Sequence, residues 1–213
     1  LISVLWSGAD ILRSKMDANE YKDYLLGIVF YKYLSDTFLI KVYDLIYDEK
    51  PKSLKVALDA YKEALEDESA EELKEQIKSE CHYLIEPQLT YTCFADAARN
   101  NAFNRELLQK AFNNIEQSDP LFVDLFTDID LYSNRLGNGD QKQSDTISSL
   151  VKEIDKADLL NSDAEILGNA YEYLIGQFAS ETGKKAGEFY TPQAVSKILT
   201  KIAIAGQENK KGL

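Results

Sequence analysis

The sequence predicts a mainly α-helical fold, a multi-helix bundle with at most a small β-hairpin. Apolar residues recur at the three- and four-residue spacing of helices in nearly every segment of the 213 residues. Hydrophobic residues make up 45% of the chain and charged residues 28%, as in globular proteins that bury a core. Three segments also carry the pattern of a helix N-terminal capping box, Asp17 with Glu20, Ser69 with Glu72, and Ser162 with Glu165.

The first third of the chain predicts a central helix. Leu5, Ala9 and Leu12 mark a short helix before it. Residues 24–34 are apolar almost all round, which is typical of a helix in the middle of a bundle. Basic residues are sparse there, so packing in the core is favoured over base stacking for the aromatic residues Tyr24, Phe30, Tyr31 and Tyr33.

The middle of the chain predicts a helical pair and then a possible β-segment. Residues 54–65 are amphipathic, and the acid-rich stretch 63–75 indicates a solvated helical pair or hairpin, with disorder of the turn as the alternative. Residues 83–85 are β-prone and stop at Pro87, which favours an edge strand or an extended loop. Residues 91–94 are expected to pair with that strand.

The second half is again helical. Asn134 to Gly139 is a loop because it contains two glycines and two asparagines. Asp119 and Pro120 are expected to open a short helix with Leu121, Leu125 and Phe126 on its apolar side. The other helices are expected over residues 107–115, 145–154 and 166–178, with a last one from Pro192 that Gly206 ends.

Charge argues against a large DNA-binding face. The formal net charge is −12, although residues 181–213 hold six lysines against three glutamates. Nucleic-acid affinity depends on Lys and Arg facing phosphates, so only the C-terminal end looks compatible with DNA. A partner protein or further sequence would have to supply the main basic surface.

Composition disfavours membrane, disulfide and metal classes. The chain has no run of about 18 apolar residues, so no membrane span is expected. Two cysteines, Cys81 and Cys93, are too few for a disulfide scaffold and favour a cytoplasmic location. His82 is the single histidine, and no partners at ligand spacing accompany it. Acid pairs such as Asp128 with Asp130 arise by chance in a chain with 36 acids.

Residues 187–193, Gly-Glu-Phe-Tyr-Thr-Pro-Gln, are the most informative segment. Thr191 can cap a helix and Pro192 suits its first position, where no backbone N–H is needed. The free N–H groups that follow would form an anion site. Gly183 and Gly187 bracket a lysine pair before it. The segment alone fits either an ordinary capped helix or a corner that holds a carboxylate ligand with an apolar body.

Four segments in order resemble the methylation (HsdM) subunit of type I restriction-modification systems. They are residues 23–35 (DYLLGIVFYKYLS), 83–87 (YLIEP), 133–138 (SNRLGN), and 168–175 (GNAYEYLI) with 187–193. The resemblance covers most of the chain, and the order of the matches is more specific than any one of them. It implies an N6-adenine DNA methyltransferase that uses S-adenosylmethionine.

The resemblance implies a division of the chain and a cofactor wall. Residues 1–180 would be the helical N-terminal domain, and residues 181–213 a linker loop and the first helix of the methyltransferase domain. That domain's Asp-Pro-Ala-Cys-Gly-Ser-Gly-like loop and Asn-Pro-Pro-aromatic motif are not among these residues, so catalytic residues are expected beyond 213 and the fragment alone is expected to be inactive. The first wall of the cofactor pocket would comprise Glu188, Phe189, Tyr190, Thr191, Pro192 and Gln193.

The implied partners are a specificity subunit, a restriction subunit, a second methylation subunit and double-stranded DNA. Residues 1–180 would serve in subunit assembly and DNA clamping. Composition alone favours another class of function, an acidic all-helical protein-interaction module without enzymatic activity. Downstream sequence would discriminate the two, since only the methyltransferase carries the cofactor loop and the catalytic motif.

Overall fold

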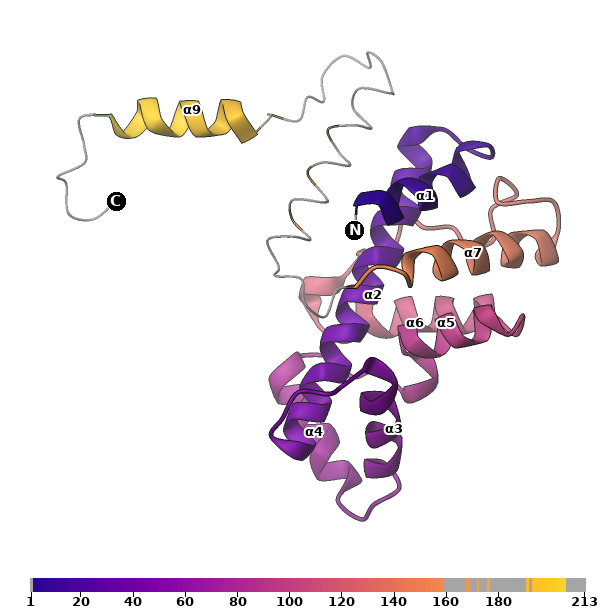
Figure 1. Ribbon diagram of the computed structural model, residues 1–213, viewed down its shortest axis with the longest axis vertical. Coiled ribbons are helices and arrows are strands. Elements are labelled where there is room, and N and C mark those ends of the chain that lie inside the picture. The colour runs from indigo at the N-terminus through magenta and orange to yellow at the C-terminus, as the bar shows by residue number, and fades with distance from the viewer. Residues whose placement is uncertain are drawn as a thin grey trace.

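The computed structural model is mainly α-helical and describes residues 2–158, Gly168, Glu172, Gly176, Thr191 and residues 193–205 (Figure 1). No strand occurs within these residues, which agrees with the predicted fold class. The helices are α1 (Ile2–Arg13), α2 (Ala18–Tyr47), α3 (Leu54–Ala64), α4 (Ala70–Cys81), α5 (Tyr91–Arg99), α6 (Arg105–Glu116), α7 (Asp140–Ile154) and α9 (Gln193–Ile204), with short 3₁₀ helices η1 (Pro87–Leu89) and η2 (Pro120–Phe122). None of the described helices is long and apolar enough to span a bilayer.

Helix α2 is the axis of the body, and α1, α3, α4, α5 and α7 all pack on it (Figure 1). It runs for 30 residues, about 45 Å at the rise of an α-helix. The predicted capping box of Asp17 and Glu20 is present at its start. Asp48 ends it in the left-handed conformation, with its N–H bonded to the Asp44 carbonyl. Residues 24–34 of α2 lack a polar face because other helices pack on α2 from several sides.

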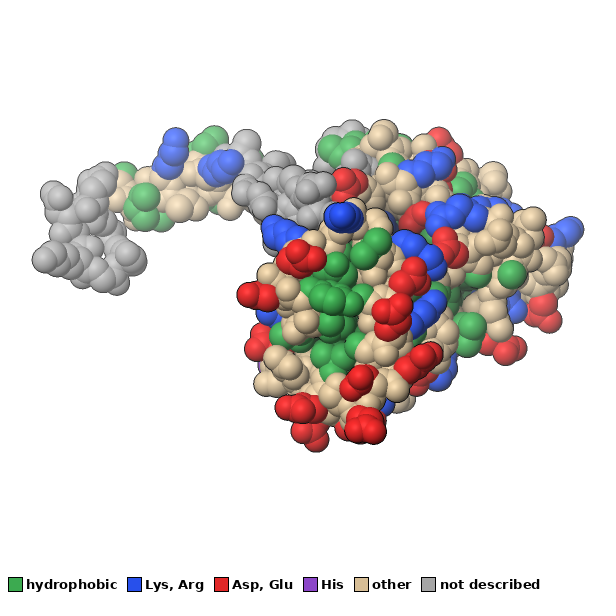
Figure 2. All heavy atoms as spheres, turned by 60° about the horizontal axis from the view of Figure 1, so that its bottom comes forward, with side chains coloured by type: hydrophobic (Ala, Val, Ile, Leu, Met, Phe, Trp, Pro, Cys, Tyr) green, Lys and Arg blue, Asp and Glu red, His purple; other side chains and the backbone are tan. Residues whose placement is uncertain are grey.

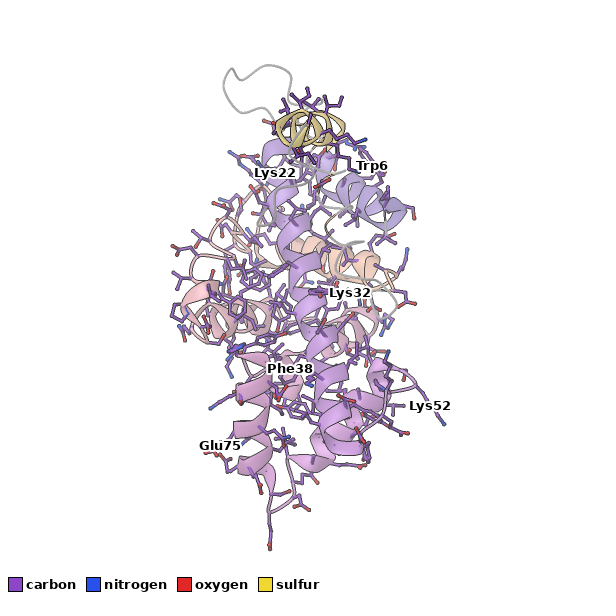
Figure 3. The ribbon with its side chains drawn as sticks, turned by 90° about the vertical axis from the view of Figure 1, so that its left-hand side faces the viewer. Trp6, Lys22, Lys32, Phe38, Lys52 and Glu75 are labelled. Carbon is purple, nitrogen blue, oxygen red and sulfur yellow. The ribbon has the colours of Figure 1, made fainter. Side chains whose placement is uncertain are left out.

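The helices α3 and α4 form the predicted helical pair at one end of α2, and each packs on α2. Phe38 of α2 fills the junction, with its ring 5.5 Å from that of Tyr61 on α3 and 5.9 Å from that of Tyr83 (Figure 3). Acidic side chains gather at this end of the body (Figure 2). Ser69 precedes α4, but its side chain makes no cap hydrogen bond and its Oγ instead donates to Asp67. The capping box predicted there is therefore wrong.

The other end of the body joins α1, α7 and α5 around the first half of α2. Gly8 lets α1 approach closely, since a Cβ there would lie 2.8 Å from Leu25 of α2 and 3.1 Å from Leu150 of α7. Buried tyrosines connect the helices through hydrogen bonds that their hydroxyls donate. Tyr31 donates to the Leu89 carbonyl at 2.6 Å and Tyr91 to the Val151 carbonyl at 2.9 Å. The core prediction for Tyr24 and Tyr31 is confirmed.

The predicted pairing of residues 91–94 with a strand at 83–85 is wrong. Residues 83–85 are an extended loop, and residues 91–94 begin helix α5. Thr90 caps that helix by accepting from the Cys93 N–H. Tyr91, Phe94, Ala95 and Ala98 then form a buried helical face, a spacing that outweighs the β-propensity of the first four residues.

The helix predicted from Asp119 is shorter than expected. Asp119 does cap it, accepting from the Leu121 N–H at 2.9 Å, but regular structure stops after Phe122. Leu121 and Leu125 are exposed, so they do not form the apolar side of a helix. Phe126 is buried and stacks on Phe112 with 4.2 Å between ring centroids, and the chain leaves the helical conformation to make this contact.

Candidate functional site

The loop that carries the predicted Ser-Asn-Arg-Leu-Gly turn is held by side chains from other elements. Lys15 donates to the Leu136 carbonyl at 3.1 Å, and Thr146 of α7 donates to the same oxygen at 2.8 Å. Tyr24 of α2 donates to the Asp130 carbonyl at 2.7 Å. Residues 130–136 are therefore fixed although they contain no regular helix or strand.

Arg105 is a further buried donor to this loop. It begins α6, is 7% exposed, and donates to the Leu131 carbonyl at 3.2 Å and to Asp140 at 3.0 Å. Its guanidinium also lies over the ring of Tyr132, 4.2 Å from the centroid. It donates to Gln143 as well. One buried cation thus joins α6, the loop and the start of α7.

Arg135 itself is exposed and forms an ion pair with Glu20 of α2. The pair borders a pocket of about 180 Å³ whose lining includes Met16, Asp23 and Asp128. Burial raises the pKa of Asp23, and Asp128 adds to the effect. The pocket is smaller than the sites of drug-sized ligands and is acidic, so it does not suit a nucleotide-like cofactor.

A buried charge network lies at the C-terminal end of α7. Lys32 and Asp36 face one another one turn apart on α2, with 2.7 Å between Nζ and Oδ2 and each side chain 3% exposed (Figure 3 labels Lys32). Lys32 also lies 3.9 Å from Asp155, the C-cap of α7, and 5.0 Å from the ring centroid of Tyr91. Arg99 of α5 forms a second ion pair with Asp155.

This network fixes the last turn of α7, since two cations from two helices hold Asp155. Desolvation raises the pKa of Asp36 to about 6, although Lys32 opposes the shift. Asp36 Oδ1 has no hydrogen-bond partner. The polar groups at this point are therefore not fully satisfied, which makes the buried pair costly to stability.

The predicted cofactor segment lies largely outside the described residues. Glu188, Phe189, Tyr190 and Pro192 are not described; Thr191 is, and it is exposed. Helix α9 begins at Gln193, which agrees with the predicted helix start. Its first turn contains no acidic side chain. The apolar positions Val195, Ile198, Leu199 and Ile202 are 43–67% exposed.

Several other sequence predictions can be compared with the described residues. Gly168, Glu172 and Gly176 are helical, and the rest of the predicted helix 166–178, with its capping box at Ser162 and Glu165, lies outside the described residues. His82 is exposed and ends α4 in the left-handed conformation. Within the described part of the chain, no group of acids, cysteines or histidine has the geometry of a metal site. The two cysteines are free and half-buried.

Sequence reasoning missed Lys15, Arg105 and the Lys32–Asp36 pair. The pair carried a readable signal, because opposite charges four residues apart inside an apolar helix have to be buried together. Lys15 and Arg105 carried none, because their acceptors, a backbone carbonyl for Lys15 and a carbonyl with two side chains for Arg105, lie more than 20 residues away.

Family models match the chain in two consecutive parts. The model described as the HsdM N-terminal domain matches residues 1–154, and the model described as N-6 DNA Methylase matches residues 162–212. The resemblance noted in the sequence is thus confirmed. The division predicted between residues 180 and 181 stays a prediction.

Similar proteins have been named and solved. The chain is 29% identical to the type I restriction enzyme MpnII methylase subunit of Mycoplasma pneumoniae, over 96% of this chain and 39% of that protein. It is 26% identical to the MjaIX methylase subunit of Methanocaldococcus jannaschii, over 93% and 34%. The crystal structure of the type I restriction-modification methyltransferase subunit from Streptococcus thermophilus matches with a TM-score of 0.90 and 50% identity, over 100% of this chain and 45% of that one.

The chain spans less than half the length of each of these relatives. The family model for the N-terminal domain nevertheless covers most of the chain, and every described helix from α1 to α7 lies within it. The chain therefore belongs to the HsdM N-terminal domain family, that of the N-terminal regions of type I restriction-modification methylase subunits, and residues 162–212 match the N-6 DNA methylase family.

Proposed function

We propose that this chain is the N-terminal part of a subunit that transfers methyl groups from S-adenosylmethionine to adenine N6 in DNA. One observation carries the proposal. The helical-domain and N-6 methylase models match consecutive parts of the chain in the order of a type I methylase subunit. Adenine must leave the base stack before its exocyclic nitrogen is accessible, so the reaction requires a flipped base and a partner that holds the duplex.

In this proposal, the N-terminal domain of residues 1–180 serves in subunit assembly and DNA clamping. In the described body, helices pack on the axial helix α2, an ion pair holds the end of α7, and a buried arginine holds the loop at residues 130–136. Its acidic surface is unsuited to phosphate contacts, which supports a role in holding other subunits. The specificity subunit, the restriction subunit and a second methylation subunit are the proposed partners, and DNA is reached through the complex.

For the cofactor, we propose the wall Glu188, Phe189, Tyr190, Thr191, Pro192 and Gln193. The described part of this wall fits a carboxylate, because α9 starts at Gln193 and its first turn carries no acidic side chain. Backbone N–H groups at a helix start stabilise an anion such as the carboxylate of the methionine end. Thr191 is exposed beside this helix start. The bound cofactor supplies the methyl group, and this wall binds and orients it.

A methyl-transfer assay tests the proposal. Full-length protein with its specificity subunit is incubated with S-adenosylmethionine labelled in the methyl group and with duplex DNA, and the methylated base is identified after hydrolysis. We expect label on adenine N6 with the full-length complex and no transfer by residues 1–213 alone. Label on cytosine, or none with an intact complex, would refute the proposed reaction, and transfer by residues 1–213 would refute the proposed division of labour.

A further inference from the structure

An exposed apolar surface lies on the segment after α6. Leu121, Val123 and Leu125 are 88%, 60% and 38% exposed. They alternate with Phe122, which packs on Tyr83 at 5.8 Å between ring centroids, and with buried Phe126. Leu121, Val123, Asp124 and Leu125 are therefore exposed, whereas Phe122 and Phe126 pack against the body. We refer to these three aliphatic residues and the carboxylates around them as the 121–125 surface.

The 121–125 surface is preformed. The Phe126 N–H donates to Glu116 at 2.7 Å, and Phe126 stacks on Phe112 of α6. On one side Asp119 caps η2, and on the other the Tyr24 hydroxyl holds the Asp130 carbonyl. The backbone is thus fixed from both ends, so exposure of the aliphatic side chains is a property of the folded domain and not of a frayed end.

The charge around these side chains has one sign. Residues 111–134 contain no Lys or Arg and five acids, Glu116, Asp119, Asp124, Asp128 and Asp130. Asp124 and Asp128 are exposed, and no ion pair involves either within the described residues. Such a surface repels DNA and anionic membranes, and a second copy of the same surface would oppose carboxylates to carboxylates. Apolar side chains ringed by Lys and Arg fit it.

We propose that the 121–125 surface docks a different protein, one that presents apolar side chains within a basic rim. Leu121 and Val123 enter the partner's apolar centre, and Asp119, Asp124 and Asp128 face its basic rim. The aliphatic residues supply affinity by leaving water, and the carboxylates guide the encounter. This inference rests on the proposed function for its assay partners, the specificity and restriction subunits of the same system.

Hydroxyl-radical footprinting of the full-length subunit, free and in the assembled complex, reads the exposure of Leu121 and Val123 directly. We expect oxidation of both side chains in the free subunit and protection in the complex. Val56 on α3, 41% exposed, is the control and should react equally in both states. Protection already in the free subunit would mean that the same chain covers the surface, and reactivity in both states would mean that no subunit does. Either result overturns the proposal.

Two variants test affinity and charge separately. Leu121→Ser with Val123→Ser should raise the Kd for assembly at least tenfold, whereas Val56→Ser should leave it unchanged. Asp119→Asn with Asp124→Asn keeps the cap and the left-handed backbone at Asp124, where φ is 62°, and should slow association and flatten its salt dependence. Wild-type affinity in the serine variant would overturn the proposal. Failure of the wild-type subunit to assemble would defeat both the proposed function and this inference.

Discussion

Replacing Lys32 by Met should destabilise the chain by about 3–5 kcal/mol at pH 7.5, because Asp36 would stay buried without its cation. The two side chains are each 3% exposed, and within the described residues no second cation pairs with Asp36, so neither water nor a neighbour compensates for the lost charge. Replacing both residues, Lys32→Met with Asp36→Leu, removes both desolvation penalties. That double variant should be as stable as wild type or more stable by about 1–4 kcal/mol.

The pair should also make stability depend on pH in a direction unusual for an acid. Desolvation, the largest cause, raises the pKa of Asp36 from 3.8 to about 6. The folded state then keeps its proton in a range where the unfolded state has released it. The contribution of Asp36 to the free energy of unfolding is greatest below about pH 4, falls as the pH rises to about 6, and is constant above. The shift corresponds to about 3 kcal/mol at 1.36 kcal/mol per unit.

Urea unfolding followed by circular dichroism, from pH 4 to pH 8, measures both effects. The reference is the double variant, because it retains every other titrating group, so the difference from wild type isolates the pair. A Lys32→Met variant within about 1 kcal/mol of wild type at pH 7.5, or a wild-type minus double-variant difference that does not change between pH 4 and 6.5, would refute the reasoning.

Three further predictions follow from single contacts. Gly27→Ala should lower the free energy of unfolding in urea by about 1–3 kcal/mol, since a Cβ would lie 1.9 Å from Ile129 Cδ1. The cost should shrink in an Ile129→Val background, which lacks that atom. Equal cost in both backgrounds would contradict the steric explanation. Tyr91→Phe should lose about 0.5–1.5 kcal/mol in the same assay, because the Val151 carbonyl loses the tyrosine hydroxyl but keeps the Asp155 N–H, and an unchanged midpoint would count against it. Thr191→Ala in the full-length protein should weaken S-adenosylmethionine binding about tenfold for each 1.4 kcal/mol of lost binding energy, measured by calorimetry; a lower melting temperature with an unchanged Kd would instead assign Thr191 to helix stability alone.

The helical architecture could be predicted from the sequence because the spacing of apolar residues and the helix-capping residues are local features. The capping box at Asp17, the all-apolar helix behind it and the loop at residues 134–139 are readable within a few residues. The error at residues 91–94 arose where β-propensity and helical spacing compete over four residues, and the spacing becomes visible only when Ala95 and Ala98 are included.

The candidate site was less predictable, for a physical reason. A motif such as residues 187–193 can be recognised, but the groups that fix the folded domain act over long separations. Arg105 reaches the Leu131 carbonyl and Lys32 reaches Asp155. No pattern in a single sequence announces such contacts, because one partner is backbone or lies on another helix. The exposure of Leu121 and Leu125 was not predicted, because sequence analysis places apolar side chains in the core by default.

The loop from Asp130 to Leu136 has one consequence for how its sequence can vary. Its shape is imposed from outside, by donors that bind main-chain oxygens. A carbonyl accepts a hydrogen bond whatever side chain its residue carries. Saturation mutagenesis should thus find the exposed Asn134 more permissive than the distant donors Lys15, Tyr24 and Arg105, whereas Tyr132 is constrained by the contact of its ring with the Arg105 guanidinium. The conformation of this loop is thus specified largely by residues of α2, α6 and the α1–α2 turn.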